Sequence, residues 1–331
     1  MLKTLLQSRR ARWSFSILAL LLVFSTIAEL WCNDRPLLVS YQGKLYAPLI
    51  HDYSETQFGG DFDVVADYHD PFIQKQISAG GNWALYPLYR YHHSTLNYFD
   101  TSTHPAPPSA EHWLGTDDRG RDVFARLVYG LRVSLWFGVL LTAVGMVLGV
   151  VMGAYQGYFA GKVDLIGQRL MEIWGAIPEL YLLLIFASLF EPSLWLLFIL
   201  LSVFGWMSLA DYMRIEFLRQ REIEYVKAAK VMGVSHHRIM FKHILPNTLA
   251  PLLSFVPFRV SAAILALTSL DFLGLGVPPE VPSIGELLLQ AKNNLDAWWI
   301  GVSVFGALVL VMVALTFLGE SLRQSMDVRK K

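Results

Sequence analysis

A glycine-rich segment that ends in a lysine is the most obvious place for this chain to bind a phosphate. The segment Gly157-Tyr-Phe-Ala-Gly161-Lys162 has the glycines and the lysine that such loops use. A phosphate-binding P-loop, however, places four residues between its first glycine and its Gly-Lys pair, and a serine or threonine then holds magnesium. Here three residues intervene, and Val163 follows the lysine. Because no other segment could cradle a triphosphate, we expect ATP to be handled by another polypeptide.

Histidines and serines could instead form a metal centre or a hydrolytic site. Four histidines lie between residues 92 and 112: His92, His93, His104 and His112. Their spacing fits no standard metal-binding pattern. The serines inside apolar runs include Ser202, Ser208, Ser254 and Ser261. No base accompanies these serines, and Cys32, the only cysteine, cannot form an intrachain disulfide. The sequence therefore predicts no catalytic residue, no metal and no cofactor.

The segment 225–247 carries side chains suited to contact with another protein. Ala228 and Ala229 leave a shallow helix face that can seat in a partner's groove. Gly233 can adopt the positive φ needed to turn between two short helices. Pro246 cannot continue a helical hydrogen-bond ladder, so we expect the second helix to end there. The alternative is an ordinary amphipathic loop, because an Ala-Ala pair followed by a glycine is common.

The chain as a whole has the composition of a membrane protein. Hydrophobic residues make up 54% and charged residues 16%, and the mean hydropathy is +0.42, which lies on the membrane side of the globular average. The net charge of zero gives no reason to expect nucleic-acid binding. An apolar helix needs about 20 residues to cross a bilayer, and six runs qualify: 14–31, 132–155, 168–190, 194–212, 249–270 and 298–319. The third run contains Glu172, Pro178 and Glu179, so its boundaries are the least defined.

The first apolar run has some features of a signal peptide, because basic residues precede it: Lys3, Arg9, Arg10 and Arg12. No small-x-small cleavage site closes the run, and Trp31 before Cys32 does not suit a lipoprotein site. We therefore interpret residues 1–31 as a tail and an uncleaved first helix.

Basic residues set the expected orientation. The loop 213–248 carries seven lysines and arginines, and the tail from 320 carries Arg323, Arg329, Lys330 and Lys331. The short loop 156–167 carries Lys162. Residues 32–131, by contrast, hold seven basic against twelve acidic side chains. We expect both termini and the loop 213–248 to be cytoplasmic.

Residues 32–131 are too polar and aromatic to lie in a membrane. We expect a small extracytoplasmic cap, which allows for some β-structure, followed by an amphipathic helix that leads into the second span. Thr116 or Asp117 is placed to cap that helix. Four charged residues can pair along or across its turns: Arg121, Asp122, Arg126 and Arg132. Their expected role is to position the span.

Small residues recur every fourth position after this helix. One series is Gly130, Ser134, Gly138 and Thr142, and the next is Gly145, Gly149, Gly153, Gly157 and Gly161. Small residues at this spacing let helices approach closely in lipid. We expect close helix packing, and a further reading is that this smooth face permits sliding or rocking between two conformational states.

Arg259 lies near the middle of the fifth apolar run. A charge at the bilayer centre costs about 2.5–3.5 kcal/mol on insertion scales, so this side chain should face protein or water. It could pair with Glu172, Glu179 or a partner subunit. It could instead line a pathway through the protein and offer a cation to a carboxylate there.

The order of residues in 225–247 resembles the cytoplasmic coupling loop, or EAA loop, of ABC importer permeases. The motif Tyr225-Val-x-Ala-Ala, Gly233, Ile239 and His243-Ile-Leu-Pro246-Asn is most similar to the dipeptide and oligopeptide branch. Lys227 stands where the glutamate that names the loop is found, which removes any salt bridge of that glutamate. The segment Leu114-Gly-Thr-Asp-x-x-Gly-Arg-Asp122 also resembles this branch. The cap and the stretch Gly285-Glu-Leu-Leu-Leu resemble more narrowly the permeases of the microcin C and oligopeptide importers.

This resemblance implies an all-α membrane protein of the type I ABC importer permease fold, with six spans and an extracytoplasmic insertion after the first. The implied divisions are 1–31, the cap 32–131, the core 132–319 with its coupling loop 213–248, and the tail 320–331. The ATPase-coupling residues would be Tyr225, Ala228, Ala229, Gly233, Ile239, His243 and Pro246.

The resemblance also implies partners and a place in the cell. The partners would be a homologous permease in a heterodimer, two ATP-binding subunits, an extracytoplasmic peptide-binding protein and a peptide. The site would be a bacterial inner membrane, and the chain itself would not be an enzyme. The rival reading is an ATP-independent secondary transporter or channel, which would need intramembrane carboxylates. The candidates in the third run are Glu172 and Glu179.

Overall fold

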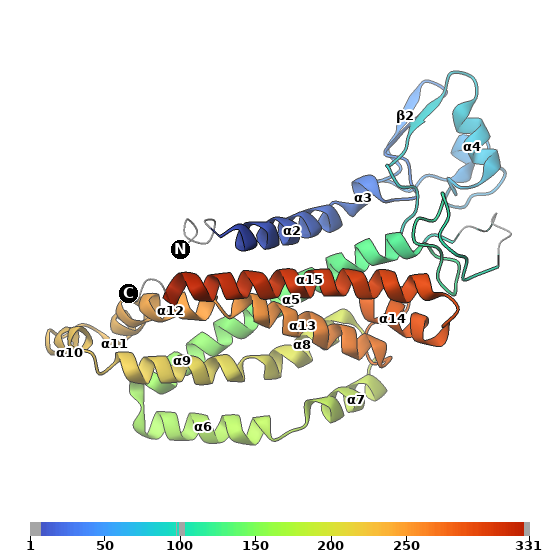
Figure 1. The fold of residues 1–331 in the computed structure, drawn as a ribbon. Coiled ribbons are helices and arrows are strands. Elements are labelled where there is room, and N and C mark those ends of the chain that lie inside the picture. Colours follow the sequence, from blue (N-terminus) through green and yellow to red (C-terminus); the bar gives the residue numbers. More distant parts are fainter. Residues whose placement is uncertain (1–7, 97, 99–102, 328–331) are drawn as a thin grey trace. The chain divides into compact units, whose positions relative to one another are not determined.

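The computed structural model describes residues 8–96, 98 and 103–327 (Figure 1). Four basic residues of the orientation argument lie outside this range: Lys3, Arg329, Lys330 and Lys331. The described residues form two units, which are considered separately. The first comprises Met1–Ala19, Ser134–Pro278 and Val309–Lys331, and the second comprises Leu20–Val133 and Pro279–Leu308.

Helices make up most of the described chain. Those of the first unit, or entering it, are α2 (Arg9–Thr26), α5 (Val123–Phe159), α6 (Gly161–Gly175), α7 (Glu179–Leu189), α8 (Leu194–Gly205), α9 (Met207–Gln220), α10 (Glu224–Val231), α11 (His236–Arg238), the π-helix η2 (Ile239–Ile244), α12 (Leu245–Leu253), α13 (Val256–Phe272) and α15 (Trp298–Asp327). Four helical stretches in the described residues are long and apolar enough to cross a membrane: Val123–Phe159, Leu194–Gln220, Pro251–Phe272 and Trp298–Ser325. They correspond to four of the six predicted spans.

The predicted third span is a bent pair of helices. α6 and α7 meet at 61° (Figure 1) and give a fifth span if they cross together. Pro178 lies at the break, directly before α7, where a proline cannot extend the ladder of α6. The loop expected at 156–167 is wrong, because Ala160 alone separates α5 from α6.

The predicted first span, 14–31, is divided. α2 ends at Thr26, and a turn at Ile27 leads to the short α3 (Ala28–Trp31). α2 also begins on three arginines, so its apolar part is short. Neither helix is among the four long apolar stretches, and the count of six spans therefore stays a prediction.

The glycine series in α5 allows close packing against α9. A Cβ atom built on Gly149 would lie 2.6 Å from Leu209 Cβ, and Cβ atoms on Gly153 and Gly157 would meet the carbonyl oxygens of Ala210 and Arg214. The prediction of close packing is confirmed for these three glycines. Gly161 does not share this role, because it begins α6 with φ +54° and open space around it.

The cap of the second unit contains a small antiparallel sheet. Its strands are β1 (Leu38–Tyr41), β2 (Lys44–Tyr46) and β3 (Trp83–Leu85), in the order β2-β1-β3. The 3₁₀-helix η1 (Glu55–Phe58) and α4 (Pro71–Ser78) accompany the sheet. Alternate residues such as Val39 and Tyr41 enter a core with Phe58. The all-α class is therefore corrected to a mainly helical one, because β-branched and aromatic residues around a Gln42-Gly43 turn form a hairpin.

A second core joins α3 to the start of α5. It contains Ala28, Cys32, Tyr89, Tyr91, Ala125 and Tyr129. Asp122 is the polar centre of this region, since it accepts hydrogen bonds from the Tyr89 hydroxyl (2.5 Å) and the Ala125 N–H (2.7 Å) and pairs with His112 Nδ1 at 2.8 Å. Asp122 therefore caps α5, and the prediction of Thr116 or Asp117 as the cap is wrong. Asp117 instead accepts from the N–H of Arg121, in the turn before the helix.

Buried charges fix this turn to α14 (Ile284–Asn293). Arg121 pairs with Asp117 at 2.8 Å, and Arg126 pairs with Glu286 at 2.7 Å. Arg121 and Arg126 also donate to the carbonyl oxygen of Pro279. The predicted pairing among Arg121, Asp122, Arg126 and Arg132 is therefore wrong. Arg121 pairs with Asp117 in the turn before the helix, Arg126 and Arg132 reach Glu286 and Glu29, and Asp122 pairs with His112.

The α5–α9 packing predicts that Gly153→Ala lowers stability. The new Cβ would lie 2.3 Å from the Ala210 carbonyl oxygen, and overpacking of this kind costs about 1–3 kcal/mol. The matched control is Gly306→Ala, also inside a helix, where a Cβ meets nothing within 4 Å. The thermal midpoint of the purified protein in detergent should fall for the first variant and hold for the second. Equal midpoints for both variants would contradict the close packing.

The environment of His93 predicts that acid destabilises the cap region. Burial, with His92 and Arg126 adding to it, lowers the pKa of His93 to about 3 from its ordinary 6.5. His93 therefore binds a proton at a higher pH in the unfolded chain than in the folded chain. Stability is lost as the pH falls below about 6.5, by at most about 1.4 kcal/mol per pH unit. Thermal midpoints between pH 7 and pH 4.5 should show this loss, and His93→Gln should reduce it. If the thermal midpoint of His93→Gln fell with pH as steeply as that of the wild type, His93 would not be the group responsible.

Candidate functional site

The inner face of α10 is part of the core of the first unit. Val226 and Ala229, one helical turn apart, are buried with Met213, Phe217 and Ile239. Ala228 is exposed. The expectation that both alanines form one outward face is therefore wrong for Ala229, because the helical period places it on the same side as Val226.

Gly233 ends α10 with the conformation that the sequence predicted. Its φ is +77°, and a Cβ atom there would meet nothing within 4 Å, so the backbone angle alone calls for glycine. The N–H of Gly233 donates to Lys230 O, and the N–H of Val234 donates to Ala229 O. These two bonds form a Schellman motif, which fixes the direction in which the chain leaves the helix.

The helix after this turn does not end at Pro246. α11, η2 and α12 follow one another without a gap, and Pro246 lies in the first turn of α12, where its missing N–H is tolerated. The N–H of Leu245 donates five residues back to Met240 O, and the Asn247 amide donates to His243 O at 3.1 Å. The predicted helix end is corrected, because this π-type widening and the asparagine satisfy the backbone around the proline.

Several side chains fasten the loop to neighbouring helices. The hydroxyl of Tyr225 donates to Gln220 Oε1 (3.1 Å) and accepts from the Asn247 amide (3.2 Å). The hydroxyl of Tyr158, at the end of α5, hydrogen-bonds to His236 Nδ1 at 2.8 Å. Tyr225 and Ile239 thus contact residues of α9, whereas His243 takes part through its backbone carbonyl, which accepts from Asn247. The sequence reasoning missed Tyr158 and His236, which no local pattern relates.

The outer face of α10 is apolar at its end. Val231 is 88% exposed and Met232 75% exposed, next to the exposed Ala228. The sequence reasoning missed this pair, although Val231 and Met232 follow the exposed Ala228 by three and four residues, a spacing that places them on its face of the helix. Lys227, beside them, pairs with Glu222 at 3.1 Å and, together with Arg221, holds the pKa of the Glu222 carboxyl below its usual value. This exposed apolar surface can bind a partner protein non-covalently.

Arg259 satisfies a break between two helices. α8 ends at Gly205, and the N–H of Leu209 donates to Trp206 O, so the Gly205 carbonyl lacks its usual helical donor. The Arg259 guanidinium donates to that carbonyl and to Ser208 Oγ at 3.0 Å. The predicted pairing with Glu172 is wrong, because Glu172 pairs with Arg169. No Arg259 ion pair with Glu179 occurs within the described chain either.

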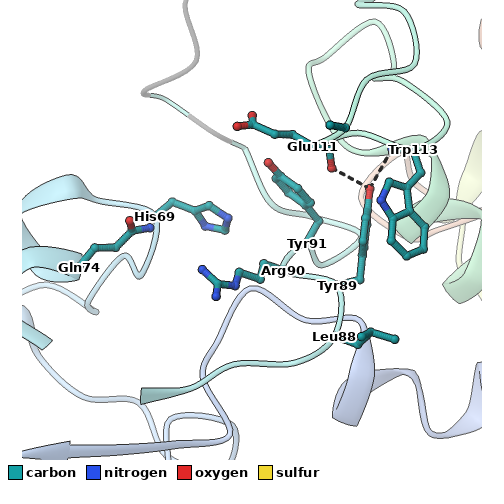
Figure 2. Close-up of a pocket in the computed structure, with 9 residues that line it drawn as sticks. His69, Gln74, Leu88, Tyr89, Arg90, Tyr91, Glu111 and Trp113 are labelled. Carbon is teal, nitrogen blue, oxygen red and sulfur yellow. Dashed lines mark hydrogen bonds between the residues drawn. The ribbon is translucent and has the colours of Figure 1, made fainter. Parts of the chain in front are cut away.

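The cap holds an open pocket of about 430 Å³ (Figure 2). Arg90, His69, Glu111 and Trp113 are among its lining residues, and Figure 2 shows the Arg90 side chain between His69 and Tyr89. The Arg90 guanidinium lies 4.1 Å from the ring centre of Tyr86. A pocket with a cation, a carboxylate and aromatic faces can hold a polar ligand that carries both charges.

Comparison with known proteins places this arrangement in a family. Residues 145–331 match the family described as "Binding-protein-dependent transport system inner membrane component". The chain is 45% identical to the "Inner membrane ABC transporter permease protein YejE" of Escherichia coli K12, over 98% of this chain and 94% of that protein. It is 42% identical to the "Peptidoglycan transport system permease protein YejE" of Agrobacterium fabrum C58, over 98% and 91%.

More distant relatives and a solved structure agree. The chain is 36% identical to the "Dipeptide transport system permease protein DppC" of Bacillus subtilis 168, over 67% of this chain and 70% of that protein. The inward-facing MetNI methionine ABC transporter is similar in fold, with a TM-score of 0.51 and 18% identity, over 61% of this chain and 97% of that chain. The fold is thus that of a type I ABC importer permease. The chain belongs to the family of binding-protein-dependent transport system inner membrane components and is a membrane permease component of an ABC importer.

Proposed function

We propose that this chain forms half of the translocation pathway of an ATP-driven importer for peptides or peptide-like compounds. Its partners are a homologous permease in a heterodimer, two ATP-binding subunits and an extracytoplasmic peptide-binding protein. The names of the E. coli, Agrobacterium and Bacillus relatives support an ABC permease with peptide-related cargo. The narrower resemblance favours microcin C-like peptides and oligopeptides.

One observation carries the coupling role, namely the two-faced build of α10. Its inner residues Val226 and Ala229 are fixed in the core, while Ala228, Val231 and Met232 are exposed. Because its inner residues are packed in the core, a partner that displaces the outer face of α10 also displaces α9 and α5. An ATP-binding subunit with an apolar groove is the expected partner for that face.

The same proposal covers the membrane topology. We assign six spans, with α2 and α3 supplying the first, both termini in the cytoplasm, and residues 32–131 outside the membrane. The acidic balance of the cap and the basic loop 213–248 support this orientation. Arg259 keeps two readings: its bonds to Gly205 O and Ser208 support a structural role, and its partial exposure leaves room for a substrate carboxylate.

A secondary transporter or channel is the competing function. It would need an intramembrane carboxylate free to exchange protons or sodium. Glu172 is engaged by Arg169, and Glu179 begins α7 beside Pro178. The family match also favours the ABC assembly.

Gly233→Pro should abolish uptake while the chain still inserts into the membrane. Proline holds φ near −65°, whereas this position has φ +77°, so the link between α10 and α11 must change direction. Peptide uptake by cells that carry the complete importer measures the effect, and membrane fractionation checks insertion. Wild-type uptake by this variant would count heavily against coupling through the loop.

Met232→Glu should release the ATP-binding subunits without unfolding the chain. The side chain is 75% exposed, so the carboxylate is solvated in the free protein but would be buried unpaired against an apolar groove, at a cost of several kcal/mol. Copurification of the ATP-binding subunits should fall at least tenfold, whereas Met232→Leu, which keeps the apolar volume, should retain them. Full copurification of the glutamate variant would exclude this face as the contact.

A further inference from the structure

A groove of about 290 Å³ lies between the first half of α2 and the last half of α15, entirely within the first unit. Each helix contributes one stripe of residues to it. On α2 the stripe contains Arg9, Trp13 and Ile17, spaced four apart, and on α15 it contains Val313 and Phe317. The interior is apolar, and the charged residues lie together at the amino-terminal end of α2.

The arginines at that end lack acidic partners. Within residues 8–96, 98 and 103–327, no carboxylate lies within ion-pair distance of Arg9 or Arg10, and both side chains are exposed. Trp13, one turn further along α2, is 70% exposed. Tryptophan and arginine side chains near a helix end are the residues that settle at the level of lipid headgroups.

We propose that this groove binds an anionic phospholipid. One acyl chain lies along the apolar stripe of Ile17, Val313 and Phe317, and the phosphate lies between the guanidinium groups of Arg9 and Arg10. Basic pockets between membrane helices bind anionic headgroups in this way. Arginine also matches phosphate geometry through paired N–H donors. The lipid would bind α2 to α15.

Charge complementarity selects a lipid over a protein helix as the occupant. A helix of a partner subunit would have to bring an acidic residue to the end of the groove and an apolar stripe to its middle. A phosphatidylglycerol molecule has this order of charge and apolar chain by its own chemistry. Ala314, only 3% exposed on the floor of the groove, leaves the room that a chain needs.

The test uses the full-length chain, purified with its copurifying subunits and stripped of lipid by detergent. The complex is then mixed with equal amounts of dioleoyl-phosphatidylglycerol and dioleoyl-phosphatidylcholine, and native mass spectrometry counts the retained lipids. Phosphatidylglycerol should be retained at least fivefold over phosphatidylcholine. Glycerophosphoglycerol, the headgroup without acyl chains, should not be retained, because it cannot contact the apolar part of the groove.

Five variants locate the site. Arg9→Gln or Arg10→Gln should each lower the lipid preference about fivefold, and Arg10→Lys should keep most of it. Arg323→Gln removes an exposed charge of α15 that does not line the groove and should change nothing. Ala314→Leu should lower phosphatidylglycerol retention by filling the floor.

Three results would overturn the proposal. They are equal retention of the two lipids by the wild-type complex, an unchanged preference in both glutamine variants, and photo-crosslinking from position 313 to a protein subunit instead of a lipid. The wild-type ratio decides the question even if a variant does not fold.

Discussion

Backbone groups within apolar helices must find hydrogen-bond partners inside the protein, because lipid offers none. The hydrogen bond from Arg259 to the Gly205 carbonyl meets this constraint at the break between α8 and α9. A second interruption, the π-helix before Pro246, lies in the loop 213–248, and there the Asn247 amide reaches His243 O. A charged side chain that looks costly in the sequence thus satisfies a polar group that would otherwise be unpaired. The bend at Pro178 between α6 and α7 is a third interruption of the same kind.

The second unit depends on buried charges. Asp117 and Arg126 are fully buried, and Glu286 is 8% exposed. Each has an oppositely charged partner, which is the condition for tolerating charge in an interior. Because removal of one partner leaves another buried and unpaired, the turn before α5 and the segment of α14 are held as one piece. Asp122 likewise joins the start of α5 to the cap, through its contacts with Tyr89 and His112.

The loop 213–248, for which we propose the coupling role, combines a packed base with an exposed tip. Its base is the packing of Val226, Ala229 and Ile239 against α9, and its tip is Val231 and Met232. The glycines of α5 let its backbone pack closely against α9. Few flexible side chains therefore separate α5 from α9, the helix on which the loop packs. Such a route suits the transmission of a small displacement.

Local sequence determined the features that depend on a single residue or on a short period. These are the apolar runs that became four long helices, the positive φ of Gly233, and the close packing at Gly149, Gly153 and Gly157. Tertiary structure decided which side each side chain faces and which partner it finds. It packed Val226 and Ala229 against α9, paired Arg126 with Glu286 and gave Arg259 a carbonyl partner. The reason is physical: helical period, glycine φ and hydropathy act within a few residues, whereas the partners of Arg126 and Arg259 come from segments tens of residues away that meet only after folding.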